Sequence, residues 1–252
     1  YDGMGRQADA VRAIGKAVAF AEGPERAKLR FEAGRRLSAL GRQEEAIREF
    51  AVLLKDQPGD LEVRRNLFSA AKAGGHNDLL AQALMEAAGS CEDEVVGIHL
   101  VTESAYLYRD KLKDAEKAIL LFTQVLQSEA ADPRVKLNSA HMLVDLLAEV
   151  GRPKDRLEVL DRLAVLEPAE SLRLAVIGTA ARLAEEIGLS DVAIAKWTER
   201  LARNPRDMEA LDSLVDLYEA SERWEPLAGV LAARAAAGVR REQRRSDLVR
   251  RA

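Results

Sequence analysis

Apolar and small residues recur along this chain in short amphipathic segments that end at glycine or proline. The clearest is residues 27–58, AKLRFEAGRRLSALGRQEEAIREFAVLLKDQP, in which Gly34 and Leu37, and then Ala46, Phe50 and Leu53, recur at helical spacing. Gly41 interrupts this stretch and Pro58 closes it, so the pattern predicts two amphipathic helices joined by a tight turn. No segment alternates between apolar and polar residues for long enough to indicate a strand.

The same unit recurs imperfectly at a nearly constant period. Pro24 and Pro58 are 34 residues apart, Pro133 and Pro168 are 35 apart, and Pro168 and Pro205 are 37 apart. A period of this length is typical of a solenoid, because one helix pair cannot bury its apolar face alone and must stack on its neighbours. The periodicity therefore predicts an all-α protein.

The unit resembles the tetratricopeptide repeat. With the closing proline counted as residue thirty-two, Gly34, Ala46 and Phe50 occupy the eighth, twentieth and twenty-fourth positions, and Gly41 lies at the turn. Small residues at the eighth and twentieth positions let the two helix backbones approach closely. Later units keep most of the pattern, although Arg156 replaces the usual alanine. The resemblance implies a right-handed α-α superhelix of about six to seven helix pairs.

One continuous solenoid is expected over residues 1–252, without a linker. We predict a lone second helix in 1–23, repeats in 24–58, 59–91, 92–132, 133–168, 169–205 and 206–238, and a lone first helix in 239–252. The lone helices, and a start at Tyr1 rather than methionine, suggest a piece of a longer array. Arginine outnumbers lysine and alanine is abundant, which favours a bacterial origin.

Charge and composition argue against several classes of protein. The 38 basic and 42 acidic residues give a net charge of −4, so nucleic acid is not an expected partner. The longest uncharged run, 118–128, is far shorter than the roughly 20 residues of a membrane span. The single cysteine, Cys91, is compatible with a reducing compartment. We expect a cytoplasmic location, and the sequence leaves secretion or the periplasm open.

No catalytic residue, cofactor or metal is expected. His76, His99 and His141 have no partner at zinc-ligand spacing. Gly74-Gly75 lacks the Lys-Ser/Thr of a phosphate loop, and no serine or cysteine has the sequence context of a nucleophile. The chain is therefore predicted not to be an enzyme.

The resemblance also implies a concave groove, into which the second, fifth, ninth and twelfth residues of each first helix point. The candidate groove residues change from mainly basic to mainly acidic along the chain: Lys28, Phe31, Arg35, Arg65 and Lys72, then His141, Asp145, Glu149, Arg182, Glu185, Glu186, Glu209, Asp212, Asp216 and Glu219. The 3-4-3 spacing of the last four puts them on one helix face. The alternative is that these are ordinary solvent-facing surfaces.

The function expected is a non-catalytic protein–protein interaction scaffold, whose acidic C-terminal half accepts a Lys/Arg-bearing segment of a peptide or protein. Chaperone C-termini are disfavoured, because the fifth and ninth positions lack the Lys and Asn that clamp a carboxylate. Three alternatives remain: a regulatory or sensor arm of a larger protein, an RNA-binding helical repeat, and self-association through open solenoid ends. The basic cluster Arg240, Arg241, Arg244, Arg245, Arg250 and Arg251 is expected to be a solvated helix face.

Overall fold

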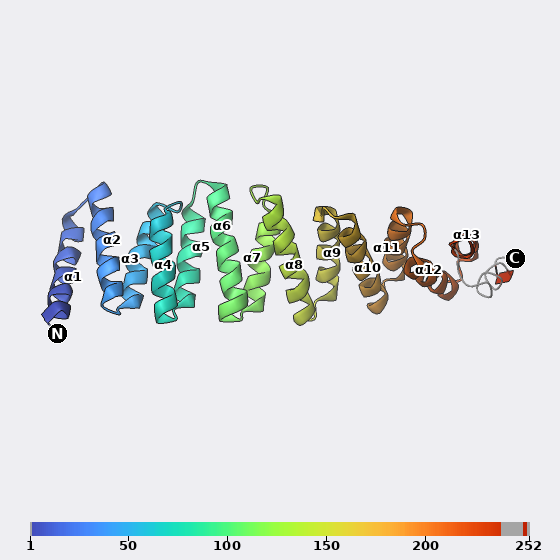
Figure 1. The fold of residues 1–252 in the computed structure, drawn as a ribbon, viewed down its shortest axis with the longest axis horizontal. Coiled ribbons are helices and arrows are strands. Elements are labelled where there is room, and N and C mark those ends of the chain that lie inside the picture. The colour runs from blue at the N-terminus through green and yellow to red at the C-terminus, as the bar shows by residue number, and fades with distance from the viewer. Residues whose placement is uncertain (1, 238–248, 251–252) are drawn as a thin grey trace. The chain divides into compact units, whose positions relative to one another are not determined.

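The computed structural model describes residues 2–237 and 249–250, with side chains from residue 9 onward (Figure 1). Within these residues it contains thirteen α-helices, one π-helical turn and no strand, so the predicted all-α class is confirmed. Most of the lone helix predicted for 239–252, with five of the six arginines of its basic cluster, lies outside the described residues.

Six helix pairs follow α1 in chain order. The elements are α1 (Asp2–Phe20), α2 (Gly23–Ala39), α3 (Gln43–Asp56), α4 (Leu61–Gly74), α5 (Asn77–Ser90), α6 (Glu94–Leu107), the π-helical turn η1 (Tyr108–Leu112), α7 (Ala115–Gln127), α8 (Pro133–Glu149), α9 (Pro153–Leu166), α10 (Glu170–Glu186), α11 (Ser190–Arg203), α12 (Met208–Ala220) and α13 (Trp224–Ala236). The even-numbered helix is the first of each pair.

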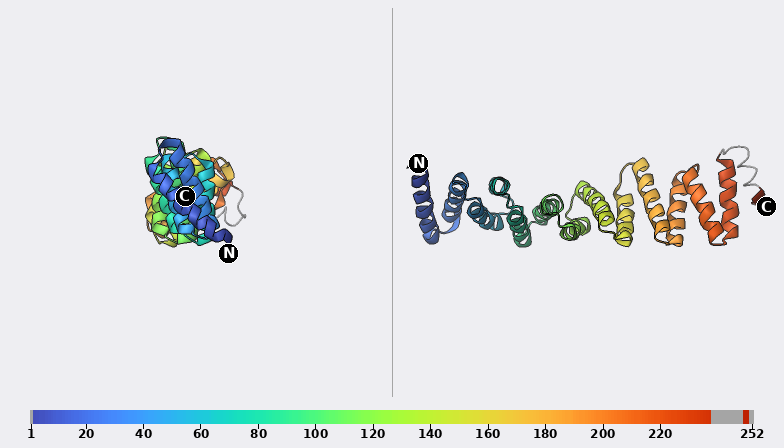
Figure 2. Two further views of the ribbon diagram at one scale, coloured as in Figure 1. Left: turned by 90° about the vertical axis from the view of Figure 1, so that its left-hand side faces the viewer. Right: turned by 90° about the horizontal axis from the view of Figure 1, so that it is seen from below.

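The chain divides into two compact units, residues 1–139 (unit 1) and 140–252 (unit 2). In unit 1 each helix from α1 to α6 packs on its successor. In addition, the first helix α2 contacts the next first helix α4, and the second helix α3 contacts the next second helix α5. First helices therefore form one layer and second helices another. In unit 2 the same neighbour-to-neighbour packing runs from α9 to α13, and the right-hand view of Figure 2 shows successive helices side by side. One continuous solenoid over the whole chain stays a prediction.

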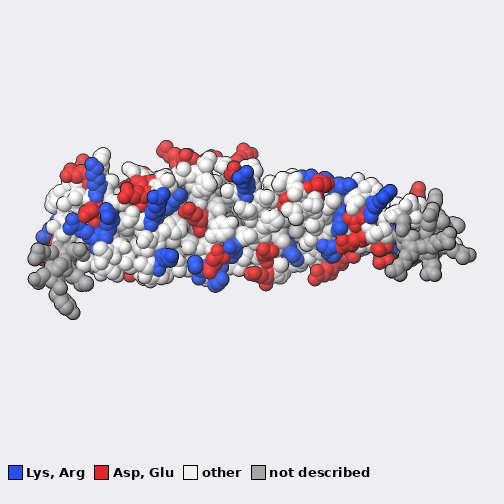
Figure 3. All heavy atoms as spheres, viewed as in Figure 1, with Lys and Arg blue, Asp and Glu red and all other residues white. Residues whose placement is uncertain are grey.

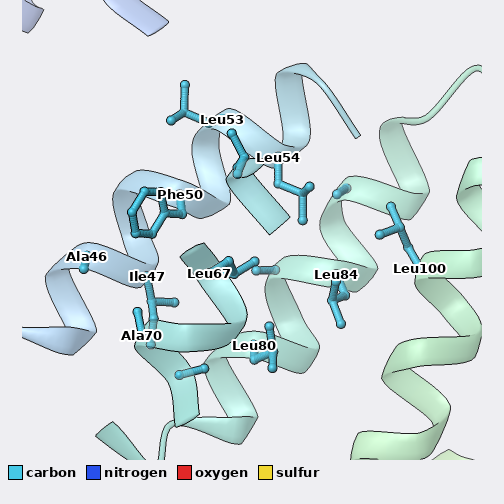
Figure 4. Close-up of a cluster of buried hydrophobic side chains, with 14 of the residues drawn as sticks. Ala46, Ile47, Phe50, Leu53, Leu54, Leu67, Ala70, Leu80, Leu84 and Leu100 are labelled. Carbon is cyan, nitrogen blue, oxygen red and sulfur yellow. The ribbon is translucent and has the colours of Figure 1, made fainter. Parts of the chain in front are cut away.

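The core of unit 1 is built from one or two large side chains of each helix. Phe50 of α3, Leu67 of α4, Leu84 of α5 and Leu100 of α6 are fully buried in one cluster (Figure 4). Each such side chain contributes roughly 1.5–3 kcal/mol by leaving water. Trp197 of α11 fills the equivalent place in unit 2. Because these two clusters each draw on at least three consecutive helices, the pairs in them depend on their neighbours for a core.

Small residues set the distance between the two helices of the first complete pair. Ala46 of α3 is fully buried, and a Cβ atom built on Gly34 of α2 would lie only 2.7 Å from Cε1 and Cζ of Phe50. The ring of Phe31 packs edge-on against Phe50, with 5.8 Å between ring centroids. The eighth and twenty-fourth repeat positions therefore meet, and the small residue at the twentieth is buried beside them in the same pair.

In each pair, the connection between the two helices contains a residue in the left-handed region of backbone dihedral space. Four pairs use glycine, as at Gly41, where φ is +77°. The other two use Lys113 and Glu222, with φ of +56° and +54°, although a side chain makes this conformation costly. At Lys113 the first helix also ends in η1, where Asp114 N donates to Tyr108 O at 2.9 Å. This π-helical turn accommodates an extra residue and was not predicted.

Replacing Gly34 with alanine is expected to destabilise the protein by about 1–3 kcal/mol, because the new methyl group overlaps a ring that is itself fully buried. Gly229→Ala in α13 is the control, because a Cβ atom there meets nothing within 4 Å and alanine gains about 1 kcal/mol in helix propensity. Urea denaturation followed by circular dichroism measures both. Equal stabilisation of the two variants would contradict the close approach at Gly34.

Candidate functional site

Four of the residues predicted to line the groove in unit 1 are basic. Lys28 and Arg35 of α2, and Arg65 and Lys72 of α4, are exposed on the side of each helix opposite its buried residues. Among the described residues none of these four cations forms an ion pair. We call the solvent-facing side of the first helices the first-helix face. In unit 1, α2 and α4 carry on this face four cations that no other described residue pairs with.

Phe31 and Lys28 meet in a hollow of about 420 Å³ between α2 and α4. Phe31 is only half-exposed, because its ring also packs on Phe50, so it belongs to the core as much as to the surface. Leu53 and Val63 add further apolar lining, and Glu62 lies at the rim. Such a hollow can accept an apolar side chain beside a charged group.

A second hollow of unit 1, of about 220 Å³, lies between α4 and α6 and was not predicted. Arg64, His99 and Glu103 line it, with Arg64 Nη1 3.8 Å from Glu103 Oε1. The other oxygen of Glu103 is buried and has no hydrogen-bond partner among the described residues. Burial raises the pKa of Glu103, and the charges of Arg64 and His99 only partly oppose that shift.

The predicted groove residues on α8 and α10 differ in whether they contact other side chains. Asp145 and Glu149 are exposed on α8, whereas His141 Nε2 lies 3.7 Å from the buried carboxylate of Glu167. On α10, Glu185 accepts a hydrogen bond from the indole N–H of Trp197, while Glu186 is exposed. Asp145, Glu149 and Glu186 form no ion pair with another described residue.

The four acidic positions of α12 share one face as predicted, but most of them are ion-paired. Glu209 pairs with Arg182 and also with Arg200, and the latter distance is 2.8 Å. Further along α12, Asp212 Oδ1 lies 2.8 Å from Nη1 of the buried Arg234, and Glu219 pairs with Arg250. Asp216 is exposed and makes no ion pair with another described residue.

Acidic and basic side chains are consequently interspersed on the face of each unit in view in Figure 3. Much of the negative charge that the sequence places in unit 2 is neutralised by arginines of other helices. A single groove running from the basic positions of unit 1 to the acidic positions of unit 2 stays a prediction.

Arg200 of α11 is the centre of an ionic network that the sequence did not reveal. Its Nε donates to Asp207 Oδ2 at 2.8 Å, while Asp207 Oδ1 accepts a hydrogen bond from Ala210 N at 3.2 Å and so caps α12. The guanidinium also lies over Trp197, 5.3 Å from the ring centroid. Gly178 leaves room for it, since a Cβ atom there would overlap Nη1 of Arg200.

The network joins two consecutive repeats, because Arg200 belongs to one and Asp207 to the next. Both side chains are largely buried, at 15% and 8% exposure. The sequence contains two signals of this network. Asp207 comes just before an amphipathic segment, and Gly178 occupies a position in a first helix. Neither signal identifies the arginine that fills the space.

Within the described residues, no group of three or more His, Cys, Asp and Glu side chains is placed to hold a metal ion. No helix in the described part of the chain is long and apolar enough to cross a bilayer.

No protein-family model and no curated protein matches this chain. Among solved structures, similarity is found to YrrB, a TPR protein with an unusual peptide-binding site, at 14% identity and a TM-score of 0.39, covering 79% of this chain and 97% of that chain. A tetratricopeptide repeat protein from Parabacteroides merdae is 13% identical, with a TM-score of 0.39 and coverage of 89% and 98%. The TPR2AB domain of yeast Sti1, in complex with pHSP90, is 14% identical, with a TM-score of 0.34 and coverage of 90% and 96%.

The resemblance to tetratricopeptide repeats is one of fold. It rests on the helix pairs, the left-handed turns and the buried small positions of this chain. The chain thus has a tetratricopeptide-like helical-repeat architecture.

Replacing Arg200 with alanine is expected to cost about 3 kcal/mol, because Asp207 is left largely buried without its cation. Arg182→Ala removes a more exposed pair and is expected to cost less than about 1 kcal/mol. Urea denaturation measures both. Asp207→Ser retains a helix cap without the charge, so it should reduce the loss caused by Arg200→Ala; strict additivity of the two changes would refute the pairing.

Glu103→Gln is expected to become more stable relative to the wild type as pH rises. The folded-state pKa of Glu103 lies above its ordinary value of 4.5, so the folded chain binds the proton more tightly than the unfolded chain. This contribution to stability is present below pH 4.5 and is lost as pH rises through the folded pKa.

Glu45 provides a control of opposite sign for this pH dependence, because its hydrogen bond with Arg42 lowers the pKa of its carboxyl. Its contribution is present at neutral pH and is lost on acidification, so Glu45→Gln should become less stable relative to the wild type as pH rises. Thermal unfolding of the three proteins between pH 3.5 and 7 compares the trends. Parallel trends for Glu103→Gln and Glu45→Gln would contradict the burial of Glu103.

Proposed function

We propose that this chain is a non-catalytic scaffold for protein–protein interaction, which binds a peptide segment or partner protein on its first-helix faces. The observation that carries the proposal is the set of charged first-helix side chains that have no ionic partner among the described residues. These charges stand on helices whose other side is fixed in the core, so a partner meets them without rearranging the fold. Binding by preorganised groups avoids much of the ordering cost.

In unit 2 the carboxylates on these helices that have neither an ion pair nor a side-chain hydrogen bond with another described residue are Asp145, Glu149, Glu186 and Asp216. They favour a segment that bears lysine or arginine. Glu209, Asp212 and Glu219 contribute less than the sequence suggested, because a basic segment must compete with an arginine already bound to each of them. The proposed binding carboxylates are therefore a subset of the predicted ones.

Selection from a random dodecapeptide library by the immobilised chain is expected to enrich lysine and arginine. Asp216→Lys should weaken binding of the selected peptides about fivefold, the effect of roughly 1 kcal/mol for an exposed charge pair. Fluorescence anisotropy with synthetic peptides measures the affinities. Asp216 is the residue to change, because Asp212→Lys would place a second cation beside the buried Arg234.

Glu225→Lys is the matched control. It makes the same charge change at an exposed position of α13, the second helix of the same pair. Equal weakening by the two variants would indicate a general charge effect, and peptides without enrichment of basic residues would reject the proposed partner chemistry. Salt-dependent binding of polyuridine in place of peptides would favour the RNA-binding alternative.

A further inference from the structure

The largest hollow described in unit 1, about 540 Å³, involves the second helices rather than the first-helix face. It lies at the ends of α5 and α7, with the beginning of α6 as its floor. Met85, Ile98, Val101 and Leu120 give it apolar walls, and the Leu120 side chain is 67% exposed. Its volume falls within the range of about 300–1,000 Å³ typical of binding pockets. We call it the α5–α7 hollow.

The two chain stretches that line this hollow contain acidic residues and no lysine or arginine. Residues 85–101 contain Glu86, Glu92, Asp93 and Glu94, and residues 120–128 contain no charged residue. Figure 3 shows acidic side chains along the edge where Figure 1 places the connection between α5 and α6. In a chain with almost equal numbers of acidic and basic residues, this segregation gives the hollow a negative potential.

The backbone adds to this negative potential. Both α5 and α7 end at the hollow, and neither has a basic residue in its last turn. The carbonyl end of a helix carries about half a negative charge, which a cation near the last turn normally offsets. Glu94, one of the lining residues, is exposed and forms no ion pair with another described residue.

We propose that the α5–α7 hollow binds a lysine or arginine side chain, together with an apolar neighbour, from a segment of a partner protein. The aliphatic stem of the bound residue packs on Met85 and Leu120, as long cationic side chains do on apolar surfaces. Its charged head meets the carboxylate of Glu94 and the amide oxygen of Gln124, which also lines the hollow. This site is separate from the first-helix face and does not depend on the function proposed for that face.

The apolar walls favour a polypeptide over a small cation. A free polyamine would satisfy the charge but would leave Leu120 exposed, whereas a segment with an apolar neighbour covers it. The chain's only cysteine, Cys91, also lines the hollow, so its alkylation reports occupancy of this place alone.

The test uses two fluorescent peptides, acetyl-Ala-Leu-Arg-Leu-Ala-Gly-amide and the same peptide with glutamine in place of arginine. The arginine peptide is expected to bind the full chain about tenfold more tightly than the glutamine peptide, because its guanidinium makes charge-assisted hydrogen bonds. It is also expected to slow alkylation of Cys91 by iodoacetamide. Glu94→Gln should weaken its binding about fivefold. Gln124→Arg should also abolish the preference for arginine, because it supplies a cation from within the protein.

Asp78→Asn is the control for Glu94→Gln, since Asp78 lies in the first turn of α5 as Glu94 lies in the first turn of α6, but does not line the hollow. It should leave binding of the arginine peptide unchanged. Circular dichroism establishes equal folding of the variants. Three results would overturn the proposal: equal binding of both peptides, binding that leaves Cys91 alkylation unchanged, or displacement of the arginine peptide by equimolar spermidine.

Asp216→Lys separates this site from the first-helix face. If the arginine peptide binds the α5–α7 hollow, this substitution in unit 2 leaves its affinity and its protection of Cys91 unchanged. If the substitution removes both, the peptide binds at the first-helix face and the hollow is not the site.

Discussion

The close approach of two helix backbones within each pair is the constraint on which the rest of this structure depends. Gly34 illustrates it, because a larger side chain there would push Phe50 out of a cluster shared by five helices. The spacing of one pair sets where its large residues reach the next pair. A change at a small position is therefore transmitted along the layer, whereas a change on the exposed side of a first helix stays local.

In unit 2, ion pairs within the scaffold reduce the charge that its surface offers to a partner. Arginines from neighbouring helices neutralise several carboxylates of α12, and one of them, Arg234, does so from a buried position. The carboxylates that remain available are dispersed over α8, α10 and α12. A dispersed pattern of this kind selects for the spacing of charges in a partner as well as for their sign.

The fold could be predicted from the sequence because it depends on local signals that repeat. Pro58, Gly41 and the apolar spacing of Leu37 and Phe50 mark the helix ends and buried faces within one unit. The exposed positions of the candidate site followed from the same periodicity. Their ion pairs did not, because Arg182 and Glu209, like Asp212 and Arg234, lie on different helices 27 and 22 residues apart. The π-helical turn at Tyr108–Leu112 and the α5–α7 hollow also depend on tertiary placement that no single repeat encodes.

The left-handed turn at Glu222 distinguishes the last described pair from the pair that precedes it. A side chain in this conformation costs free energy that glycine at Gly188 avoids in the preceding pair. The salt bridge between Arg200 and Asp207 offsets this cost from outside the pair, since it secures the start of α12 to its neighbour. Amide hydrogen exchange in α12 and α13 would then follow the integrity of α11, making the end of the array a cooperative extension of the repeat before it.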